Sequence, residues 1–558
     1  MREPMTGGEA ILRSLISHGV DSTFGIPGVQ TYPFFDAIAK HSEQVRHYTP
    51  RHEQSAAYMA TGYAKSTGKP GIYSVVPGPG ILNAGAAIST AKATNTPTLL
   101  ITGQVPSSYL GIGRGHLHEL QDQLATLKGI TKWSGRIENP KSAPLMVNEA
   151  YKHMTTGRPG PVALEMCWDA MMTTEEIEQL PASQTEDTPS VNPELVKQAV
   201  ALISAAKNPM IMVGGGAQHA HESVLELATM LDAPVTAFRS GRGIVSEDHE
   251  LGVSSAAAYE LWPDTDVLIG IGSRLELQYM RWTGMGAYDS KPATPPHLIR
   301  IDIDPLEMDR LQPEVGIVAD AQDGTNELIA MLVHRGFRSK GHKQRIAEAK
   351  AKARQKIGKI QPQLAYLDVI RDVLPRDGFF IKDLCQVGYA SYFGFAVYEP
   401  LTYITSGYQG TLGFAFPTAL GVKAGNPDRS VVAVVGDGGF MFGIQELATA
   451  AQEKLGLVTL VFSNGGYGNI RRDQRRLFDD RVVGADLTAP DFVMLAQSFG
   501  VRAHRVNTPE ALRPVLSSAL ESHLPTVIEV QVESNSEVSP WEFIVRTPES
   551  SSGGLKIV

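Results

Sequence analysis

The sequence predicts an α/β protein made of three doubly wound parallel-sheet domains. The chain has 558 residues, more than one hydrophobic core usually serves, so about three domains are expected. Along the chain, short apolar segments alternate with segments whose apolar residues recur at helical spacing. This alternation is typical of parallel sheets that are covered by helices on both faces.

Two polar segments separate three blocks of this alternation. Residues 172–193 are acidic and contain prolines, as linkers often do, and residues 340–359 form a basic run. We expect the basic run to be a helical connector with a solvated face; nucleic-acid contact is the alternative. The predicted units are an N-terminal domain (1–175), a central domain (190–338), a C-terminal domain (362–546) and a flexible tail (547–558).

Composition narrows the class of protein. Hydrophobic residues make up 42% of the chain and charged residues 20%, as in an ordinary globular protein. The net charge of −9 argues against a nucleic-acid binder. Two cysteines, Cys167 and Cys385, exclude a disulfide framework or a zinc cluster. The sequence begins without a charged-then-apolar signal pattern and has no membrane-length apolar run, so we expect a cytoplasmic protein that does not bind membranes.

The first and third blocks contain similar units of strand, glycine-rich turn, helix and strand. In the first block we expect strands at 21–26, 71–76 and 98–102 and helices at 8–18, 53–67 and 83–94. The unit 71–102 parallels 431–462, where strand 431–435 precedes a helix at 442–454 and strand 457–462. The central block has strand-like segments at 209–213, 267–269 and 299–303. The sequence therefore predicts two related sheets on either side of a different central one.

The third block places oxygen ligands at one sheet edge. Asp437 follows the first strand of its unit, and Asn464, 27 residues later, follows the second. Carboxyl ends of parallel strands meet at one edge, where such sheets bind ligands. A carboxylate, an amide oxygen and a free carbonyl such as that of Gly466 make a hard oxygen site that suits Mg²⁺.

A second candidate group lies in the first block. Glu53 begins the predicted helix 53–67, whose small residues Ala56, Ala57 and Ala60 indicate burial. We therefore expect Glu53 to be poorly hydrated, with a raised pKa that suits proton exchange with a weak base. The alternative is a simple first-turn partner of the helix dipole.

Together these segments resemble thiamine diphosphate (ThDP) enzymes. The Gly-Asp-Gly turn with its distant asparagine resembles their diphosphate–Mg²⁺ signature, and residues 51–68 (RHEQSAAYMATGYAKSTG) resemble their first-domain signature. The chain is similar to the acetolactate synthase-like, 2-oxo acid decarboxylase branch over nearly its whole length, through GIPG at 25–28, GPGILN at 78–83, TGQVP at 102–106, IDIDP at 301–305 and GYQGTLGF at 407–414.

The resemblance implies a pyrimidine-binding, a central Rossmann-like and a diphosphate-binding domain, with active sites between the subunits of a homodimer or homotetramer. It implies that Glu53 bonds the aminopyrimidine ring, that the Gly410 carbonyl meets its amino group and that Leu412 bends the cofactor. Asp437, Asn464 and Gly466 would hold Mg²⁺. Further cofactor contacts are expected from Pro27, Gly28, Pro79, Asn83, Gln386, Gly438, Gly439 and Tyr467.

The resemblance is weakest at the residues that select the substrate. The loop 113–119 (GRGHLHE) replaces a Phe-Gln pair of acetolactate synthases, and we expect His118 and Glu119 to be catalytic; a surface loop is the alternative. The resemblance implies that Gln30, which follows GIPG at 25–28, also faces the cavity, and we expect it to be catalytic. Ile470 stands where simple pyruvate decarboxylases have a catalytic glutamate, and Asp473 lies near a position that is tryptophan in acetolactate synthases. These differences argue against pyruvate-to-acetolactate activity.

The sequence leaves several functions open. The leading one is ThDP- and Mg²⁺-dependent cleavage or formation of a C–C bond beside a carbonyl, chiefly 2-oxo acid decarboxylation with or without carboligation. A 2-hydroxyacyl-CoA lyase or oxalyl-CoA decarboxylase-like enzyme, with CoA or ADP in the central domain, is the alternative; bound FAD is not favoured. A nucleotide-binding dehydrogenase or a non-catalytic cofactor-binding protein is a rival of another class, but no convincing GxGxxG turn supports the dehydrogenase.

Overall fold

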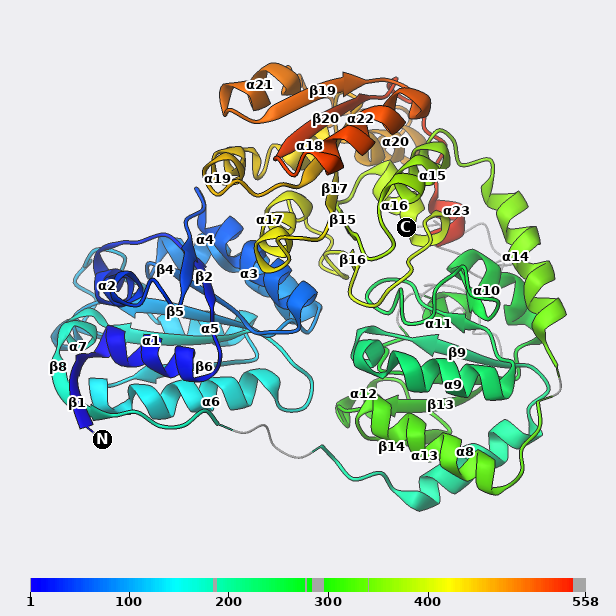
Figure 1. Cartoon of the computed structure of the whole chain (residues 1–558), viewed down its shortest axis with the longest axis horizontal. Helices are drawn as coiled ribbons and strands as arrows, with labels where there is room; N and C mark the ends of the chain where they lie inside the picture. The colour runs from blue at the N-terminus through cyan, green and yellow to red at the C-terminus, as the bar shows by residue number, and fades with distance from the viewer. Residues whose placement is uncertain (1, 184–187, 276–277, 284–295, 340, 545–558) are drawn as a thin grey trace.

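The computed structural model describes residues 2–183, 188–275, 278–283, 296–339 and 341–544. Figure 1 shows three domains, each with a six-stranded sheet flanked by helices, so the predicted fold class is confirmed. The tail predicted at 547–558 lies outside the described residues. Among the described helices, none is long and apolar enough to cross a membrane.

The N-terminal sheet is parallel throughout and has a core on each face. Leu99 and Ile101 point to one core and Leu100 to the other, the period-two alternation of a sheet covered on both sides. In sheet order the strands are β3 (Arg46–Tyr48), β2 (Ser22–Gly25), β4 (Gly71–Val75), β5 (Thr98–Gln104), β7 (Val162–Cys167) and β6 (Trp133–Ile137). The helices are α1 (Gly7–Ser17), α2 (Tyr32–Lys40), α3 (Glu53–Thr67), α4 (Pro79–Ala93), α5 (Gln123–Ile130), α6 (Ala143–Thr155) and α7 (Trp168–Met172).

Part of the predicted linker 172–193 is a strand. β8 (Thr174–Glu178) pairs antiparallel with β1 (Arg2–Thr6), and its Ile177 is buried. The prediction of a linker was wrong over these residues. The segment is polar, and the strand that it pairs with, β1, lies far away in the sequence, at the start of the domain.

The central sheet has the strand order typical of dinucleotide-binding folds, 3-2-1-4-5-6 counted along the domain. Its strands are β11 (Gly252–Val253), β10 (Val235–Thr236), β9 (Pro209–Val213), β12 (Val267–Ile271), β13 (His297–Asp302) and β14 (Val315–Val318). Its helices are α8 (Pro193–Ala205), α9 (His221–Leu231), α10 (Ser255–Leu261), α11 (Gln278–Trp282), α12 (Leu306–Arg310) and α13 (Ala321–His334). The basic run forms α14 (Lys343–Ile357), which runs from this domain to the next (Figure 1), as predicted.

The C-terminal sheet repeats the strand order of the N-terminal one, which confirms that the two domains are similar. Its strands are β16 (Tyr403–Ile404), β15 (Phe379–Lys382), β17 (Val431–Gly436), β18 (Val458–Ser463), β20 (Thr526–Gln531) and β19 (Arg502–Val506). Its helices are α15 (Gln363–Val373), α16 (Gln386–Gly394), α17 (Ala415–Gly425), α18 (Asp437–Phe440), α19 (Leu447–Gln452), α20 (Gly468–Leu477), α21 (Phe492–Ser498), α22 (Pro509–Glu521) and α23 (Trp541–Ile544).

The helix predicted at 442–454 is shorter than expected. Gly443 has non-helical angles (φ −137°, ψ 17°), and a 3₁₀ turn, Ile444–Glu446, precedes α19. Phe442 lies against Gly413, where a Cβ would come 2.4 Å from the Phe442 Cβ. The chain therefore stays close to the 407–413 loop before the helix begins.

The N- and C-terminal domains share one core. Helices α3 and α17 lie side by side between them (Figure 1), and one apolar cluster continues from residues of α3 to residues of α17. Glycines allow this close approach. A Cβ on Gly62 would lie 2.0 Å from the Thr418 carbonyl oxygen, and one on Gly421 would lie 1.9 Å from that of Met59.

Candidate active site

Asp437 organises the edge of the C-terminal sheet. It is buried at the start of α18, and its Oδ2 accepts hydrogen bonds from the amides of Asn464 (3.1 Å), Gly465 (2.8 Å) and Gly466 (3.2 Å). Its Oδ1 accepts from the amide of Gly438 (2.8 Å). The carboxylate thus draws the turn after β18 against the turn after β17. Asp437, Asn464 and Gly466, the three residues predicted to hold a metal, are therefore brought together.

Two side-chain oxygens near this turn are buried without a partner. Within the described residues, Oδ1 of Asn464 and Oε1 of Gln386 receive no hydrogen bond. A buried, unsatisfied acceptor is costly unless a donor or cation meets it. Asn464 Oδ1 and the Asp437 carboxylate are hard oxygen donors of the kind Mg²⁺ binds. The described residues contain no cluster of three or more His, Cys, Asp or Glu that could hold a metal, so a site here would also need amide or carbonyl oxygens, such as those of Asn464 and Gly466.

Glycines shape the rest of this edge. A Cβ on Gly438 would lie 2.5 Å from the Tyr467 ring, and one on Gly466, whose φ is +155°, would lie 2.2 Å from the Ala485 oxygen. Both positions therefore require glycine. Gly439 lies near the carboxylate of Asp383: a Cβ on Gly439 would lie 3.4 Å from Oδ2 of Asp383.

The loop 407–413 forms the other wall. Gly410 has a φ of +59° and is exposed, and Leu412 is half-buried. The amide of Gly413 donates to Asp383 Oδ2 (3.0 Å), and the hydroxyl of Tyr58 in α3 lies 2.9 Å from that of Thr411. Gly410, whose carbonyl is predicted to accept from the amino group of the cofactor, and Leu412, predicted to bend the cofactor, therefore stand on a loop anchored at both domains.

Glu53 is the first residue of α3, as predicted, but it is not buried within the chain. It is half-exposed, and its Oε2 accepts a hydrogen bond from Nδ2 of Asn83 in α4 (3.0 Å). The buried face of α3 begins at Ser55, so the first residue stays at the sheet edge. Exposed Pro79, the first residue of α4, lies at the same edge.

A glutamine and a histidine meet nearby. Buried Gln30 donates from Nε2 to the Leu117 carbonyl (2.9 Å), and its Oε1 lies 3.0 Å from Nδ1 of His118. Because a carbonyl can only accept, the NH₂ of Gln30 must face Leu117, and Oε1 must accept from His118. Nδ1 of His118 therefore carries a hydrogen, and Nε2 is the nitrogen left for other partners.

The 113–119 loop is an ordered turn on the edge of the N-terminal sheet. His118 has a φ of +66°, and a Cβ on Gly78 would lie 2.5 Å from the His118 oxygen. Glu119 accepts from the amides of Gly115 (2.7 Å) and His116 (2.9 Å); the His116 amide first, and then Gly115, hold the pKa of Glu119 below its usual range. The carboxylate of Glu119 therefore caps the turn.

Gly28, one of the predicted cofactor contacts in the N-terminal domain, packs closely against Val76. A Cβ there would lie 2.2 Å from Cγ1 of Val76, and its amide donates to the Thr31 hydroxyl (3.2 Å). Pro27 beside it is exposed. Within the described residues, no hydrogen bond or ion pair joins Glu53 to the Asp437–Asn464 turn. One chain thus carries two separate candidate half-sites, each at the carboxyl edge of its own sheet.

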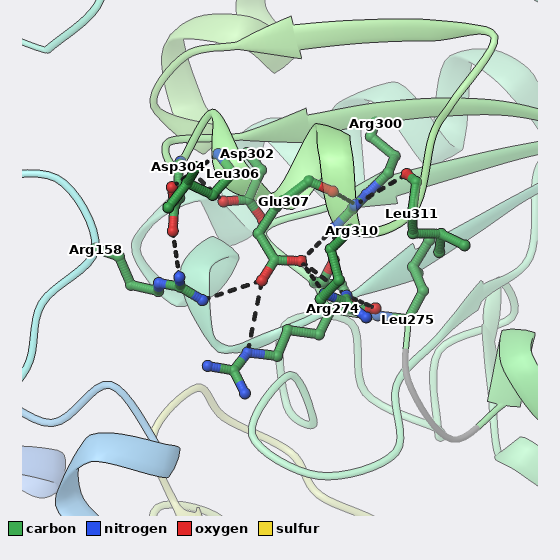
Figure 2. Close-up of polar contacts among 11 residues, drawn as sticks. Arg158, Arg274, Leu275, Arg300, Asp302, Asp304, Leu306, Glu307, Arg310 and Leu311 are labelled. Carbon is green, nitrogen blue, oxygen red and sulfur yellow. Dashed lines mark hydrogen bonds and ion pairs between the residues drawn. The ribbon is translucent and has the colours of Figure 1, made fainter. Parts of the chain in front are cut away.

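The edge of the central sheet holds an ionic cluster instead (Figure 2). Glu307 pairs with Arg300 (3.1 Å), Arg310 (2.7 Å) and Arg158 (3.0 Å), and Arg158, from the N-terminal domain, also pairs with Asp304. The arginines Arg310 and Arg300 hold the pKa of Glu307 below its usual range, against the effect of its burial. This cluster ties the first domain to the second.

The glycine turns of the central domain pack on each other. A Cβ on Gly214 would lie 2.3 Å from the Gly272 oxygen, and one on Gly272 would lie 2.6 Å from the Ala217 nitrogen. This contact accounts for the glycine at each of these two positions. Arg274 extends from the second turn over the ring of Tyr408 (5.0 Å), next to the 407–413 loop.

Comparisons with known proteins agree with this geometry. Three family models match: the N-terminal TPP binding domain of thiamine pyrophosphate enzymes over residues 5–126, the central domain over 196–328 and the C-terminal TPP binding domain over 385–530. The probable acetolactate synthase large subunit of Methanocaldococcus jannaschii is 33% identical, over 95% of this chain and 92% of that protein. The chain belongs to the thiamine pyrophosphate enzyme family.

Two further relatives of this thiamine pyrophosphate enzyme differ in their named activity. The probable 2-ketoarginine decarboxylase AruI of Pseudomonas aeruginosa is 32% identical, over 95% of this chain and 94% of that protein. Acetolactate synthase isozyme 1 large subunit of Escherichia coli is 30% identical, over 97% and 96%. The resemblance to the acetolactate synthase-like branch is therefore confirmed, and the chain is a ThDP enzyme of that type.

Sequence reasoning missed the buried groups Asp383, Gln123 and Glu165 and the half-buried Glu537, which lie around the two candidate half-sites of the enzyme. Burial raises the pKa of Asp383 to about 6, and its Oδ2 accepts the hydrogen bond from the Gly413 amide (3.0 Å). It follows strand β15 as Asp437 follows β17, a signal that the strand pattern could have given. Gln123 links the Gly78 amide (3.3 Å) to Glu165 (2.7 Å). Glu537 accepts from Asn464 (2.8 Å).

Proposed function

We propose that the chain is a ThDP- and Mg²⁺-dependent enzyme that decarboxylates a 2-oxo acid, with or without ligation of the product to a second carbonyl compound. The observation that carries the proposal is a pair of buried oxygens beside the Asp437 turn, Asn464 Oδ1 and Gln386 Oε1, which have no partner in the part of the chain that the structure describes. ThDP supplies a carbon nucleophile and an electron sink when bound. The residues of the chain supply binding, orientation and proton exchange.

The C-terminal half-site is assigned to the diphosphate end. Asp437, Asn464 and the Gly466 carbonyl would hold Mg²⁺, which takes its remaining ligands from phosphate oxygens and water. Gly438 and Gly439 lie in the first turn of α18, and neither has a Cβ that would hinder a close approach to their amides. Gln386 begins α16 at the same edge, and Tyr467 covers Gly438. Gly410 and Leu412 are assigned to the pyrimidine and the bend of the cofactor.

The N-terminal half-site is assigned to proton exchange. Asn83 binds one oxygen of Glu53, and the other oxygen is left for the pyrimidine half of the cofactor. We assign Nε2 of His118, the ring nitrogen that does not bond to Gln30, to giving or taking a proton at the substrate. Pro27, Gly28 and Pro79 would line this half-site, and Glu119 keeps the His118 turn in shape.

A second copy of the chain would complete the site. Apolar side chains are exposed beside both half-sites: Leu82, next to Asn83, is 57% exposed, and Met441 and Phe442, after α18, are 46% and 50% exposed. Exposed apolar patches of this kind mark interfaces. We propose a homodimer or homotetramer in which Glu53 of one subunit meets the Asp437 turn of another. Location in the cytoplasm remains a prediction from sequence.

The substrate class follows from the relatives and from the loops. The relatives named above are acetolactate synthases and a decarboxylase, which favours 2-oxo acids over acyl-CoA substrates. Ile470 is exposed at the position where simple pyruvate decarboxylases have a catalytic glutamate, and its side chain cannot transfer a proton, so we assign proton transfer to His118. Decarboxylation is therefore proposed ahead of acetolactate formation.

The test is CO₂ release from a panel of 2-oxo acids (pyruvate, aliphatic, aromatic and guanidino-bearing), with aldehyde and hydroxyketone products separated by chromatography. Glu53→Gln should bind ThDP but lower turnover by about 10²–10⁴-fold, the usual size of an acid–base contribution. Exposed Glu43 lies on the same domain, and Glu43→Gln is the matched control. Aldehyde release from 2-hydroxyacyl-CoA without CO₂ release from any 2-oxo acid would refute the proposal.

A further inference from the structure

The predicted metal ligand Asn464 has a carboxylate behind it. Its Nδ2 donates to Oε2 of Glu537 (2.8 Å), and its Oδ1, at the other end of the same amide, is buried with no partner among the described residues. The backbone amide of Asn464 is held by Asp437 (3.1 Å). The side chain is therefore fixed at its base and at one end, and its free end is an acceptor.

The two ends of an amide are chemically different. Its NH₂ can only donate, and its oxygen can only accept; an ionised carboxylate can only accept. With Glu537 as partner, the NH₂ must face Glu537, and Oδ1 is turned the other way. Without such a partner, the amide can rotate and turn its NH₂ toward the cation. An NH₂ group can only donate hydrogen bonds and therefore cannot be a ligand of the cation.

The segment that carries Glu537 is anchored on both sides. After β20, the amide of Val532 donates to the Ser463 carbonyl (2.9 Å). Farther along, the amide of Val538 donates to the Gln361 carbonyl (3.2 Å), and Gln363 donates to the Val538 carbonyl (2.6 Å). Glu537 is thus delivered to Asn464 by a segment pinned to the sheet and to the start of α15.

We propose that Glu537 is a positioning residue that orients the Asn464 amide so that its oxygen faces the metal. The inference rests on the proposed function, because it assumes a cation at Asp437 and Asn464. Partners of metal ligands that act in this way commonly change metal affinity by about 10–100-fold. Glu537 itself touches neither cofactor nor substrate in this role.

The test is the affinity for Mn²⁺ in the presence of ThDP, measured from the electron paramagnetic resonance signal of free Mn²⁺ during titration of the apo-protein. Glu537→Gln keeps the size of the side chain but lets it pair with either end of the amide, so affinity should fall by about 10–100-fold. Glu533→Gln is the matched control: it removes the same charge from the same segment, and its side chain is exposed. It should change affinity by no more than about twofold, because exposed charges are screened.

The same substitution, Glu537→Gln, in an Asn464→Asp protein separates the effect of Glu537 on amide orientation from the effect of its charge. Asn464→Asp places two equivalent oxygens at this position, so no amide needs to be oriented, and the new carboxylate faces that of Glu537. In this background, Glu537→Gln should strengthen Mn²⁺ binding, since it removes a repulsion and supplies a donor. If Glu537 acted through its charge alone, Glu537→Gln would weaken binding in both backgrounds.

The outcomes distinguish the inference from the function it rests on. If wild-type protein takes up no Mn²⁺ with ThDP, the proposed function and the inference both fail. If the wild type binds and Glu537→Gln equals Glu533→Gln, or weakens binding equally in both backgrounds, the inference alone fails. Unchanged thermal midpoints of the apo-variants exclude a general loss of structure as the cause of weaker binding.

Discussion

The contact that holds the start of helix α3 comes from another domain. Glu446, in the C-terminal domain, is fully buried, and both of its carboxylate oxygens lie 3.0 Å from the amide of Arg51. Its Oε2 also accepts from the Thr449 hydroxyl (2.6 Å). Arg51 stands two residues before Glu53, so this carboxylate determines where the proposed catalytic glutamate lies.

We therefore predict that Glu446→Ala destabilises the chain and displaces Glu53. Hydrogen bonds to a charged group contribute about 1.5–3 kcal/mol each, and the unpaired amide and hydroxyl left behind would add a desolvation penalty. Burial raises the pKa of Glu446. Keeping this carboxylate ionised in the protein interior therefore costs free energy, and this cost offsets part of the stabilisation from its hydrogen bonds. A net loss of about 2–4 kcal/mol is expected, or roughly 4–8 °C in thermal midpoint.

Differential scanning calorimetry of the apo-protein measures this effect, with two companion variants. Glu446→Gln keeps the shape and one acceptor and should cost less than half as much. Glu453→Gln removes the surface pair with Arg46 (3.2 Å) at the same domain interface; because Arg46 is 60% exposed, about 0–1 kcal/mol is expected. A midpoint for Glu446→Ala at or above that of Glu453→Gln would refute the reasoning.

Three further predictions concern other parts of the chain. Burial raises the pKa of Asp383 from 3.8 to about 6, so the folded protein holds this proton more tightly than the unfolded one and loses about 3 kcal/mol as pH rises from about 4 through about 6. The midpoint of Asp383→Asn relative to wild type should therefore rise with pH over that window; a flat difference would contradict the assignment. Gly62→Ala should lower the midpoint, because its Cβ would lie 2.0 Å from the Thr418 oxygen, whereas Gly129→Ala, in open space on α5, should leave it unchanged or slightly higher; equal effects would exclude tight packing of α3 on α17. Gln30→Leu and His118→Ala should lower kcat/KM by similar factors and the double variant no further, because the pair acts as a unit; additive losses would show independent roles.

The sequence was a good guide wherever local pattern decides position. Parallel strands end at a common edge, so strand 431–435 and strand 457–462 were enough to bring Asp437 and Asn464 together. The start of α3 at Glu53 was predicted to the residue. The start of α4 was placed too late, although Pro79 is a typical first helical residue.

Contacts between segments that lie far apart in the sequence could not be predicted from it. Glu537 lies 73 residues from Asn464, in a polar segment with no periodic pattern. Glu446 lies 395 residues from Arg51, and nothing in the sequence around Glu446 indicates that its carboxylate contacts another domain. The half-exposure of Glu53 has the same origin, since the packing around a helix end depends on which surfaces meet it.

The central claim is that a metal held by Asp437 and Asn464 binds the diphosphate of ThDP. Isothermal titration of ThDP into the apo-protein, with Mg²⁺ and with EDTA, tests it most directly. We predict binding with Mg²⁺, and its loss in EDTA and in Asp437→Ala, while Asp428→Ala, an exposed aspartate of the same domain, binds as wild type does. Undiminished ThDP binding in EDTA, or by Asp437→Ala with Mg²⁺, would contradict the claim.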